Sequence, residues 1–205
     1  TSNQNEVTIK AIPREDPAES VGVLMEREGK VRVIEYSEIS DTERLAADAT
    51  GRLKYGYASI SLFALDLNFV QKVGAEDEDR MPYHLALKAA YFLNAKGETV
   101  KSKSPVAWKF EKFIFDFLPL SKKVGIIAYP RKKCYAPLKN AEGPHSLKTV
   151  QEALLESDRT VFSALTGKEA PAGNFELAQE FYYPTPELLK RWNGRTDHSN
   201  EYVEL

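Results

Sequence analysis

Two strand-like runs joined by a tight turn at residues 20–40 constrain the fold more than any other feature. The stretch "SVGVLMEREGKVRVIEYSEIS" has apolar and β-branched residues on both sides of "REGK", and its Glu-Gly pair supplies the turn. This pattern predicts a β-hairpin. Another strand is predicted at 6–12, where "EVTIKAI" alternates and then meets Pro13.

Helix-like segments alternate with these strands. Capping residues before an apolar run, amphipathic spacing and terminal glycines predict helices at 40–51, 75–94, 109–123 and 146–167, with a strand leading into a helix at 54–74. A lysine-rich exposed hairpin or loop is expected between the second and third of these helices, and "VGIIAYPR" reads as a further strand. "NFELAQEF" and "YPTPELLKRWNG" are expected to be short helices, and the tail "RTDHSNEYVEL" to be weakly ordered.

This alternation predicts an α/β fold with a mixed sheet and flanking helices. The stretch "GKEAPAG" at 167–173 is the weakest joint in the chain. We therefore expect one α/β domain over 1–167 and a small helical appendage over 168–205.

Composition limits the classes of function. Hydrophobic residues make up 42% of the 205 residues, enough for a core, and the net charge of −2 gives no electrostatic reason to bind nucleic acid or a membrane surface. The single cysteine, Cys134, excludes a disulfide within the chain and favours a reducing, cytoplasmic location. A start without Met, almost directly on a strand, is what a fragment of a longer protein would show.

The motifs of common catalytic sites do not occur. The sequence has no Gly-x-Ser-x-Gly, no Walker A loop and no G-x-G-x-x-G, and its three histidines lack the spacing of metal ligands. Cys134 has no paired base nearby in sequence, so a structural role is favoured over a nucleophilic one. His84 is expected to be a packed or surface histidine in the helix that begins at "MPYH".

Two polar positions have both an ordinary and a functional interpretation. Glu35, followed by Tyr36, either lies on the solvent face of a strand or belongs to a strand-end group that binds sugar hydroxyls. Lys139, in "YAPLKNAEG" after a core strand, is either a solvated loop lysine or a phosphate-binding group. The residues alone leave both choices open.

Several motifs together resemble a known family. In order and spacing the chain is similar to the UDP-sugar pyrophosphorylases, in particular to the UDP-N-acetylhexosamine (UDP-GlcNAc) pyrophosphorylases, over residues 6 to 160. The matching stretches are "ESVGVL", "VIEYSEIS", "GRLKYGYASIS", "MPYHLALK", "KFEKFIFDF" and "YAPLKNAEG".

The resemblance implies a Rossmann-like nucleotidyltransferase fold and a reaction in which UTP and a sugar 1-phosphate give a UDP-sugar and pyrophosphate, with Mg²⁺. It implies that Glu35 binds sugar hydroxyls with Tyr36 beside it, and that Phe113 and Phe115 line the pocket for the N-acyl group. If their segment is helical, at most one of these rings faces the pocket; if it is extended, both can. Lys139 would hold the phosphates and stabilise charge during the transfer.

Two departures from the family pattern matter. Ser59 in "YGYASIS" stands where the family has a sugar-contacting Asn, which leaves the sugar identity open. The family's Gly-rich uridine-binding loop and metal-binding Asp have no match here, so the Mg²⁺ ligands are expected outside this chain, which corresponds to the C-terminal half and is expected to be inactive alone. The alternatives are a non-catalytic sugar-phosphate or protein-binding module and a UTP:glucose-1-phosphate uridylyltransferase.

Overall fold

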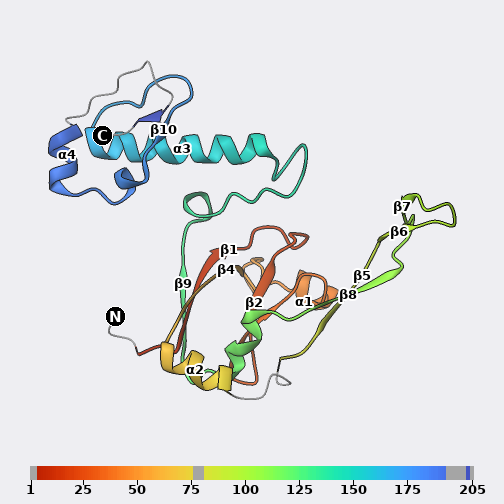
Figure 1. Cartoon of the computed structure of the whole chain (residues 1–205). Helices are drawn as coiled ribbons and strands as arrows, with labels where there is room; N and C mark the ends of the chain where they lie inside the picture. The colour runs from red at the N-terminus through yellow and green to blue at the C-terminus, as the bar shows by residue number, and fades with distance from the viewer. Residues whose placement is uncertain (1–3, 76–80, 193–201, 204–205) are drawn as a thin grey trace. The chain divides into compact units, whose positions relative to one another are not determined.

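The computed structural model describes residues 4–75, 81–192 and 202–203. The chain divides into two compact units, Thr1–Pro130 and Arg131–Leu205, which are described separately (Figure 1). The elements of the first unit are β1 (Val7–Pro13), β2 (Gly22–Arg27), β3 (Lys30–Ile34), α1 (Asp41–Leu45), β4 (Tyr57–Leu65), α2 (Leu67–Ala75), β5 (His84–Lys88), β6 (Tyr91–Leu93), β7 (Thr99–Lys101), β8 (Ala107–Glu111), the 3-10 helix η2 (Ile114–Leu120) and β9 (Val124–Ala128).

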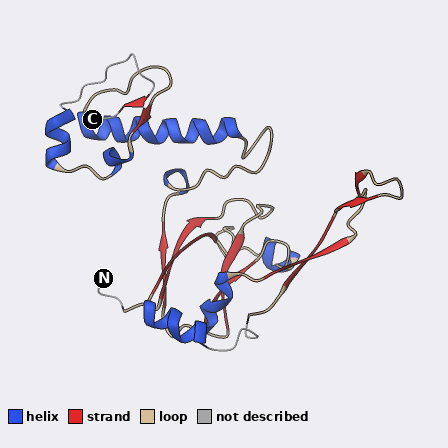
Figure 2. Cartoon of the chain, viewed as in Figure 1, coloured by secondary structure: helices blue, strands red, loops and turns tan. Residues whose placement is uncertain are grey.

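A mixed five-stranded sheet forms the body of the first unit, in the order β3-β2-β4-β1-β9. Strand β9 is parallel to β1, and the other neighbours are antiparallel. The predicted hairpin is confirmed as β2 and β3. Its turn residues Glu28 and Gly29 have φ of 54° and 69°, as a tight hairpin turn requires. The predicted α/β class is also confirmed, and Figure 2 shows the strands with their helices.

The main core lies between the sheet and the elements α2 and η2. Alternate residues of the strands point into it, while Val23 and Met25 point to the other face and pack with Ile39. The buried members of the main core are Val7, Ile9, Ala11, Leu24, Val33, Phe69, Val73, Phe115 and Leu118. This packing fixes β3 against η2, and therefore the strand end at Glu35 against the segment that carries Phe113 and Phe115.

The predicted helix at 75–94 is wrong in its described part. Residues 76–80 lie outside the described residues, and the rest forms β5 and β6. The stretch "YHLALK" alternates with period two, which puts Leu85 and Leu87 on one face and His84 on the other. Strand β5 pairs with β8, and β6 with β7, in a two-stranded ribbon that extends away from the sheet in Figure 1. The β6–β7 pair confirms the expected lysine-rich hairpin.

The predicted buried helix at 109–123 is also wrong. Phe110 belongs to β8 and is 62% exposed, Phe113 is extended at φ −116° and ψ 138°, and only η2 is helical. Pro119 within η2 has no amide hydrogen to donate, which disfavours a regular α-helix there. The helix predicted at 40–51 forms but ends at Leu45, because Ala46 leaves the helical region. The strand-to-helix change predicted within 54–74 is confirmed by β4 and α2.

The second unit contains η3 (Arg131–Lys133), α3 (Leu147–Thr166), β10 (Glu176–Leu177), the 3-10 helix η4 (Gln179–Tyr182), α4 (Pro186–Trp192) and β11 (Tyr202–Val203). The long helix α3 is confirmed, and Gly167 ends it with a φ of 68°. "NFELAQEF", predicted helical, instead contains β10 and η4, whereas α4 agrees with the prediction. Residues 193–201 and 204–205 of the tail lie outside the described residues.

The apolar face of α3 explains why the division between the units falls at 130/131, earlier than the predicted domain boundary at 167/168. Phe162 packs in one cluster with Leu177, Phe181 and Trp192, so the helix and the C-terminal segment share a core. No helix among the described residues is long and apolar enough to span a membrane.

Candidate functional site

Glu35 and Tyr36 lie in a tight turn directly after β3. The backbone oxygen of Glu35 accepts hydrogen bonds from the amides of Glu38 at 2.9 Å and of Ile39 at 3.1 Å. Ile39 is only 8% exposed and anchors the turn, whereas the Tyr36 side chain is 43% exposed. The structure therefore presents both predicted sugar-binding residues at a strand end, as the sequence indicates.

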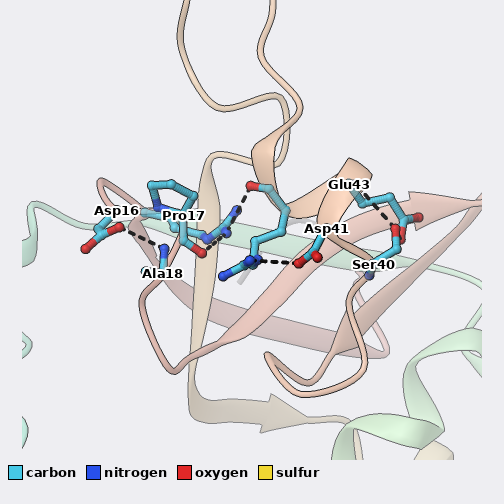
Figure 3. Close-up of polar contacts among 8 residues, drawn as sticks. Asp16, Pro17, Ala18, Ser40, Asp41 and Glu43 are labelled. Atoms are coloured by element: carbon cyan, nitrogen blue, oxygen red, sulfur yellow. Dashed lines mark hydrogen bonds and ion pairs between the residues drawn. The ribbon is translucent and has the colours of Figure 1, made fainter.

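The turn continues into α1 through a capping box (Figure 3). The Ser40 hydroxyl accepts a hydrogen bond from the Glu43 amide at 3.3 Å, and the Glu43 carboxylate accepts one from the Ser40 amide at 3.4 Å. Arg44, in the last turn of α1, donates to Asp41 at 2.7 Å. These contacts set the direction in which the chain leaves the turn at 35–39.

A buried arginine supports this region from the end of β1. Arg14 is 5% exposed and donates to the backbone oxygens of Tyr55 at 3.3 Å, Pro17 at 2.9 Å and Arg44 at 3.3 Å. Burial lowers the pKa of its guanidinium below the usual value. Arg14 thereby joins its own loop at Pro17 to the segments at Arg44 and Tyr55, and Figure 3 shows the segments of Pro17 and α1.

Arg14 and Tyr36 also line one small pocket. The other lining residues are Pro17, Ala18, Glu19, Val23, Ile39 and Arg44. Its lining thus combines the apolar side chains of Val23 and Ile39 with the charged side chains of Arg14, Glu19 and Arg44.

Glu35 and Ser59 both lie beside Gly22. A Cβ atom on Gly22 would lie 2.7 Å from Cγ1 of Val33, so a larger residue would displace Val33, and 3.5 Å from Oε1 of Glu35, an ordinary contact distance. Ser59 is the register partner of Gly22 across β2 and β4, and directly opposed side chains share a face of the sheet. The Glu35 carboxylate and the Ser59 side chain therefore lie on the same face.

Ser59 begins a bulge in β4. The register between β1 and β4 shifts between Lys10 and Ala11, and Ser61 adopts a φ of 58°. The Ser61 amide donates to the Ser59 hydroxyl oxygen at 3.3 Å, and Ser59 is 8% exposed. This hydroxyl helps to hold the bulge, which re-aims the chain beside Glu35.

Phe113 and Phe115 are stacked. Their ring centroids are 4.8 Å apart and their planes differ by 18°, although Phe113 is extended and Phe115 belongs to η2. Phe115 is only 5% exposed and belongs to the main core, whereas Phe113 is half-buried against it. Phe113 is therefore the ring that can contact a ligand, and Phe115 supports it from behind.

His84 joins the strand-end turn to this aromatic pair. Its Nδ1 lies 2.8 Å from Oε1 of Glu38, and its Nε2 lies 2.9 Å from Oδ2 of Asp116. The His84 ring centroid is 4.8 Å from that of Phe113. Burial lowers the pKa of His84, but its hydrogen bonds to Asp116 and Glu38, with the charges of both, outweigh burial and raise that pKa above 6.5.

Sequence reasoning missed the roles of His84, Glu38, Asp116 and Gly22. His84 was assigned to a helix, in which its ring would not have a fixed cross-strand neighbour. The signal was present, because Glu38, His84 and Asp116 each lie within one of the matching stretches "VIEYSEIS", "MPYHLALK" and "KFEKFIFDF".

Lys139 belongs to the second unit, in a loop closed on itself. The Lys139 and Asn140 amides donate to the His145 backbone oxygen at 2.8 Å and 3.0 Å, and the Asn140 side chain donates to the Pro144 oxygen at 2.6 Å. The Lys139 side chain is exposed. These bonds give the loop a defined backbone, while the predicted phosphate role of Lys139 stays a prediction.

Within 4–75 and 81–192, no three His, Cys, Asp or Glu side chains gather as metal ligands. No step of the proposed reaction is assigned to a metal held by these residues.

Comparison with known proteins gives no match to a family model. Among curated proteins, the chain is 38% identical to a probable UDP-N-acetylglucosamine pyrophosphorylase of Dictyostelium discoideum over 65% of its own length, and 34% identical to one of Caenorhabditis elegans over 75%. The alignments cover only 28% and 32% of those two relatives, so the chain spans about a third of their length at most.

Solved structures agree with this relationship. A putative UDP-N-acetylglucosamine pyrophosphorylase from Entamoeba histolytica superposes on 85% of this chain and 41% of its own with a TM-score of 0.68 at 26% identity. The corresponding enzyme of Trypanosoma brucei, solved with an inhibitor, covers 79% of this chain and 32% of its own with a TM-score of 0.60 at 26% identity.

The mixed sheet, its flanking helices and these neighbours place the chain in the α/β nucleotidyltransferase class. Within that class, it is similar to the UDP-N-acetylglucosamine pyrophosphorylases over part of their length. The resemblance predicted from the motifs is confirmed.

Proposed function

We propose that this chain supplies the sugar-binding part of a uridylyltransferase that joins UTP and an N-acetylhexosamine 1-phosphate. An oxygen of the sugar phosphate forms a new bond to the α-phosphorus of UTP, and the bond from that phosphorus to pyrophosphate breaks. The observation that carries the proposal is the meeting of the turn at 35–39 with Phe113 and Phe115 inside one compact unit of a chain related to such enzymes.

The chemistry of these residues suits a sugar. A carboxylate such as Glu35 accepts hydrogen bonds from two hydroxyls, and Tyr36 supplies a further donor beside it. The exposed side of Phe113 offers an apolar surface for an acetyl group. Lys139 would act on the phosphates as a positioned charge that stabilises the transferring group.

The replacement at Ser59 keeps glucose 1-phosphate as the alternative substrate. The family's sugar-contacting Asn is replaced by Ser59, and the Ser59 hydroxyl already accepts a bond from the Ser61 amide. A serine hydroxyl that already accepts this bond has fewer hydrogen-bonding groups left for the sugar than an amide side chain has. Discrimination between sugars would therefore depend mainly on Phe113.

The test has two parts. The gene product that carries this sequence is assayed for pyrophosphate release from UTP with N-acetylglucosamine, N-acetylgalactosamine or glucose 1-phosphate, and the 205-residue chain is assayed in parallel. We expect turnover with an N-acetylhexosamine 1-phosphate by the gene product and none by the chain alone. No release with any of the three sugars would refute the proposal.

Lys139→Ala sharpens this test. Loss of one preorganised charge at the transferring phosphate is expected to lower kcat about 100- to 1,000-fold. Lys133→Ala, another exposed lysine of the second unit, is the matched control and should leave kcat within about twofold, as expected for a surface change. Equal kcat values for the two variants would remove Lys139 from the catalytic residues.

A further inference from the structure

Three segments that are far apart in sequence converge on His84. Glu38 comes from the turn after β3, Asp116 from η2, and His84 itself from the first position of β5. The His84 side chain is 15% exposed, and its contact with Asp116 is partly buried, whereas its contact with Glu38 is exposed. The residue therefore lies at the joint between the two halves of the proposed sugar site.

The geometry suits the doubly protonated ring. A neutral imidazole has one N–H and can donate to one carboxylate only, whereas an imidazolium donates from both nitrogens. Here Nδ1 faces both Glu38 oxygens, at 2.8 Å and 2.9 Å, and Nε2 faces Asp116 at 2.9 Å. Two acceptors, one on each side of the ring, match two donors.

The other charged groups near His84 do not offset this arrangement. Glu111 of β8 is its register partner and shares its face of the ribbon, and Glu111 pairs with Lys109 at 2.7 Å. The ring thus contacts two carboxylates directly, and the third carboxylate on its face of the ribbon, Glu111, is paired with a lysine. Proton loss from His84 would leave two carboxylates bridged by a ring that satisfies only one of them.

The ring also contacts the aromatic pair directly. Its centroid lies 4.8 Å from the Phe113 ring and 5.9 Å from the Phe115 ring. A change in the orientation of the imidazole would therefore displace Phe113, the half-buried ring that is open to a ligand. His84 thus contacts both the turn at 35–39 and Phe113.

We propose that His84 is a positioning residue, which in its doubly donating form fixes the turn at 35–39 relative to Phe113 for recognition of an N-acyl hexosamine. The inference rests on the proposed function for its ligand. It goes beyond that function by naming the group that aligns the site and by making sugar recognition depend on pH. Because both ring nitrogens are already engaged, His84 acts through its neighbours and does not contact the sugar.

The first experiment measures, without a ligand, how strongly Glu38 and Asp116 favour the protonated His84 ring. The His84 ring is titrated by NMR in the wild-type chain and in the variants Glu38→Gln and Asp116→Asn, which keep the size of each side chain. We expect the wild-type midpoint to lie above 6.5 and each variant to lower it. A wild-type midpoint at or below 6.5, or one that neither substitution moves, would overturn the inference.

The second experiment measures recognition. Binding of methyl N-acetylglucosaminide and of methyl glucoside is followed by NMR at pH 6 and pH 9, because neither sugar titrates in that range. The wild-type affinity for the N-acetyl sugar is expected to fall by about fivefold at pH 9, a typical size for coupling between sites. His84→Gln should bind it about fivefold more weakly at both pH values, with affinity for methyl glucoside unchanged.

The outcomes separate the two proposals. If the wild-type chain does not prefer the N-acetyl sugar, the proposed function fails and the inference fails with it. If it does prefer that sugar, but neither pH nor His84→Gln changes the preference, the inference alone fails. Should His84→Gln not fold, Glu38→Gln and Asp116→Asn decide the matter, because each keeps His84 and must reproduce the loss at pH 6.

Discussion

Two cationic side chains lie near the turn at 35–39 and differ in what they bind. Arg14 lines a pocket with Tyr36 and Ile39 of the turn and donates to three backbone oxygens outside it, and none of these acceptors titrates. His84 contacts the turn directly and lies between the carboxylates of Glu38 and Asp116. The hydrogen bonds of Arg14 therefore persist over the physiological pH range, whereas those of His84 depend on the pH.

The difference follows from the chemistry of the two cations. A guanidinium keeps its proton even where burial lowers its pKa, and its fixed fork can reach several carbonyls at once. An imidazole has an ordinary pKa of 6.5, so modest changes in its surroundings decide whether it donates from one nitrogen or from two. Arg14 beside Tyr36 keeps its charge, whereas His84 beside Phe113 can gain or lose a proton. One part of the site can therefore stay fixed while the other responds to pH.

The largest effect is expected for Arg14→Met, which keeps the apolar stem and removes the donors. The backbone oxygens of Tyr55, Pro17 and Arg44 lose a charged partner, so the free energy of unfolding of the first unit should fall by about 3 kcal/mol. Urea unfolding followed by the NMR signals of Ile9 measures this loss. The loss should be the same at pH 6 and pH 8.5.

A matched control is Arg27→Met. Arg27 pairs with Glu43, and its side chain is 46% exposed, so its removal should cost less than about 1 kcal/mol. Equal losses for the two variants would mean that the burial of Arg14 contributes nothing specific.

His84→Gln is the second prediction and the sharpest contrast with Arg14. Because the folded-state pKa of His84 is raised above 6.5, its stabilisation is complete below pH 6.5 and is lost as the pH rises through the raised pKa. The variant should be less stable than the wild type by about 2 kcal/mol at pH 5.5, with a smaller difference at pH 9. Urea unfolding at the two pH values gives both numbers, and a difference that grows with pH would contradict the assignment.

The contrast between these two side chains also shows what sequence reasoning could and could not reach. The hairpin, β9, α3 and the strand-end position of Glu35 follow from local patterns, so periodicity and turn chemistry were sufficient for them. The prediction of a helix over 75–94 depends on its acidic start and fails at 84–93, where "YHLALK" alternates with period two.

The polar contacts could not be predicted for a different reason. Arg14 meets Tyr55 because β4 pairs with β1, and His84 meets Glu38 although β5 and β3 belong to different sheets. No local pattern encodes such pairings. The family resemblance identified which stretches matter, but the partners within them became visible only when the chain was folded.

The third prediction compares the two carboxylates around His84. The Asp116 side chain is 14% exposed and that of Glu38 is 35% exposed, so the bond to Asp116 is less screened by water. Asp116→Asn should therefore lower the free energy of unfolding by about 1.5 kcal/mol at pH 6, and Glu38→Gln by about 1 kcal/mol. In the double variant the losses should not add, because both act through one ring.

The smallest effect is expected for Ser40→Ala, which removes the side-chain half of the capping box. The Glu43 amide loses its acceptor, and α1 is an exposed helix of five residues, so the cost should be about 0.5 kcal/mol, the low end for a cap. The Ser40 hydroxyl is also the largest of the causes that lower the pKa of Glu43, so that pKa should rise in the variant. An NMR titration of Glu43 checks this shift. If Ser40→Ala instead lowered the midpoint of His84, the contacts of Arg14 and of His84 would be coupled through the turn, and the division into pH-independent and pH-dependent contacts would have to be abandoned.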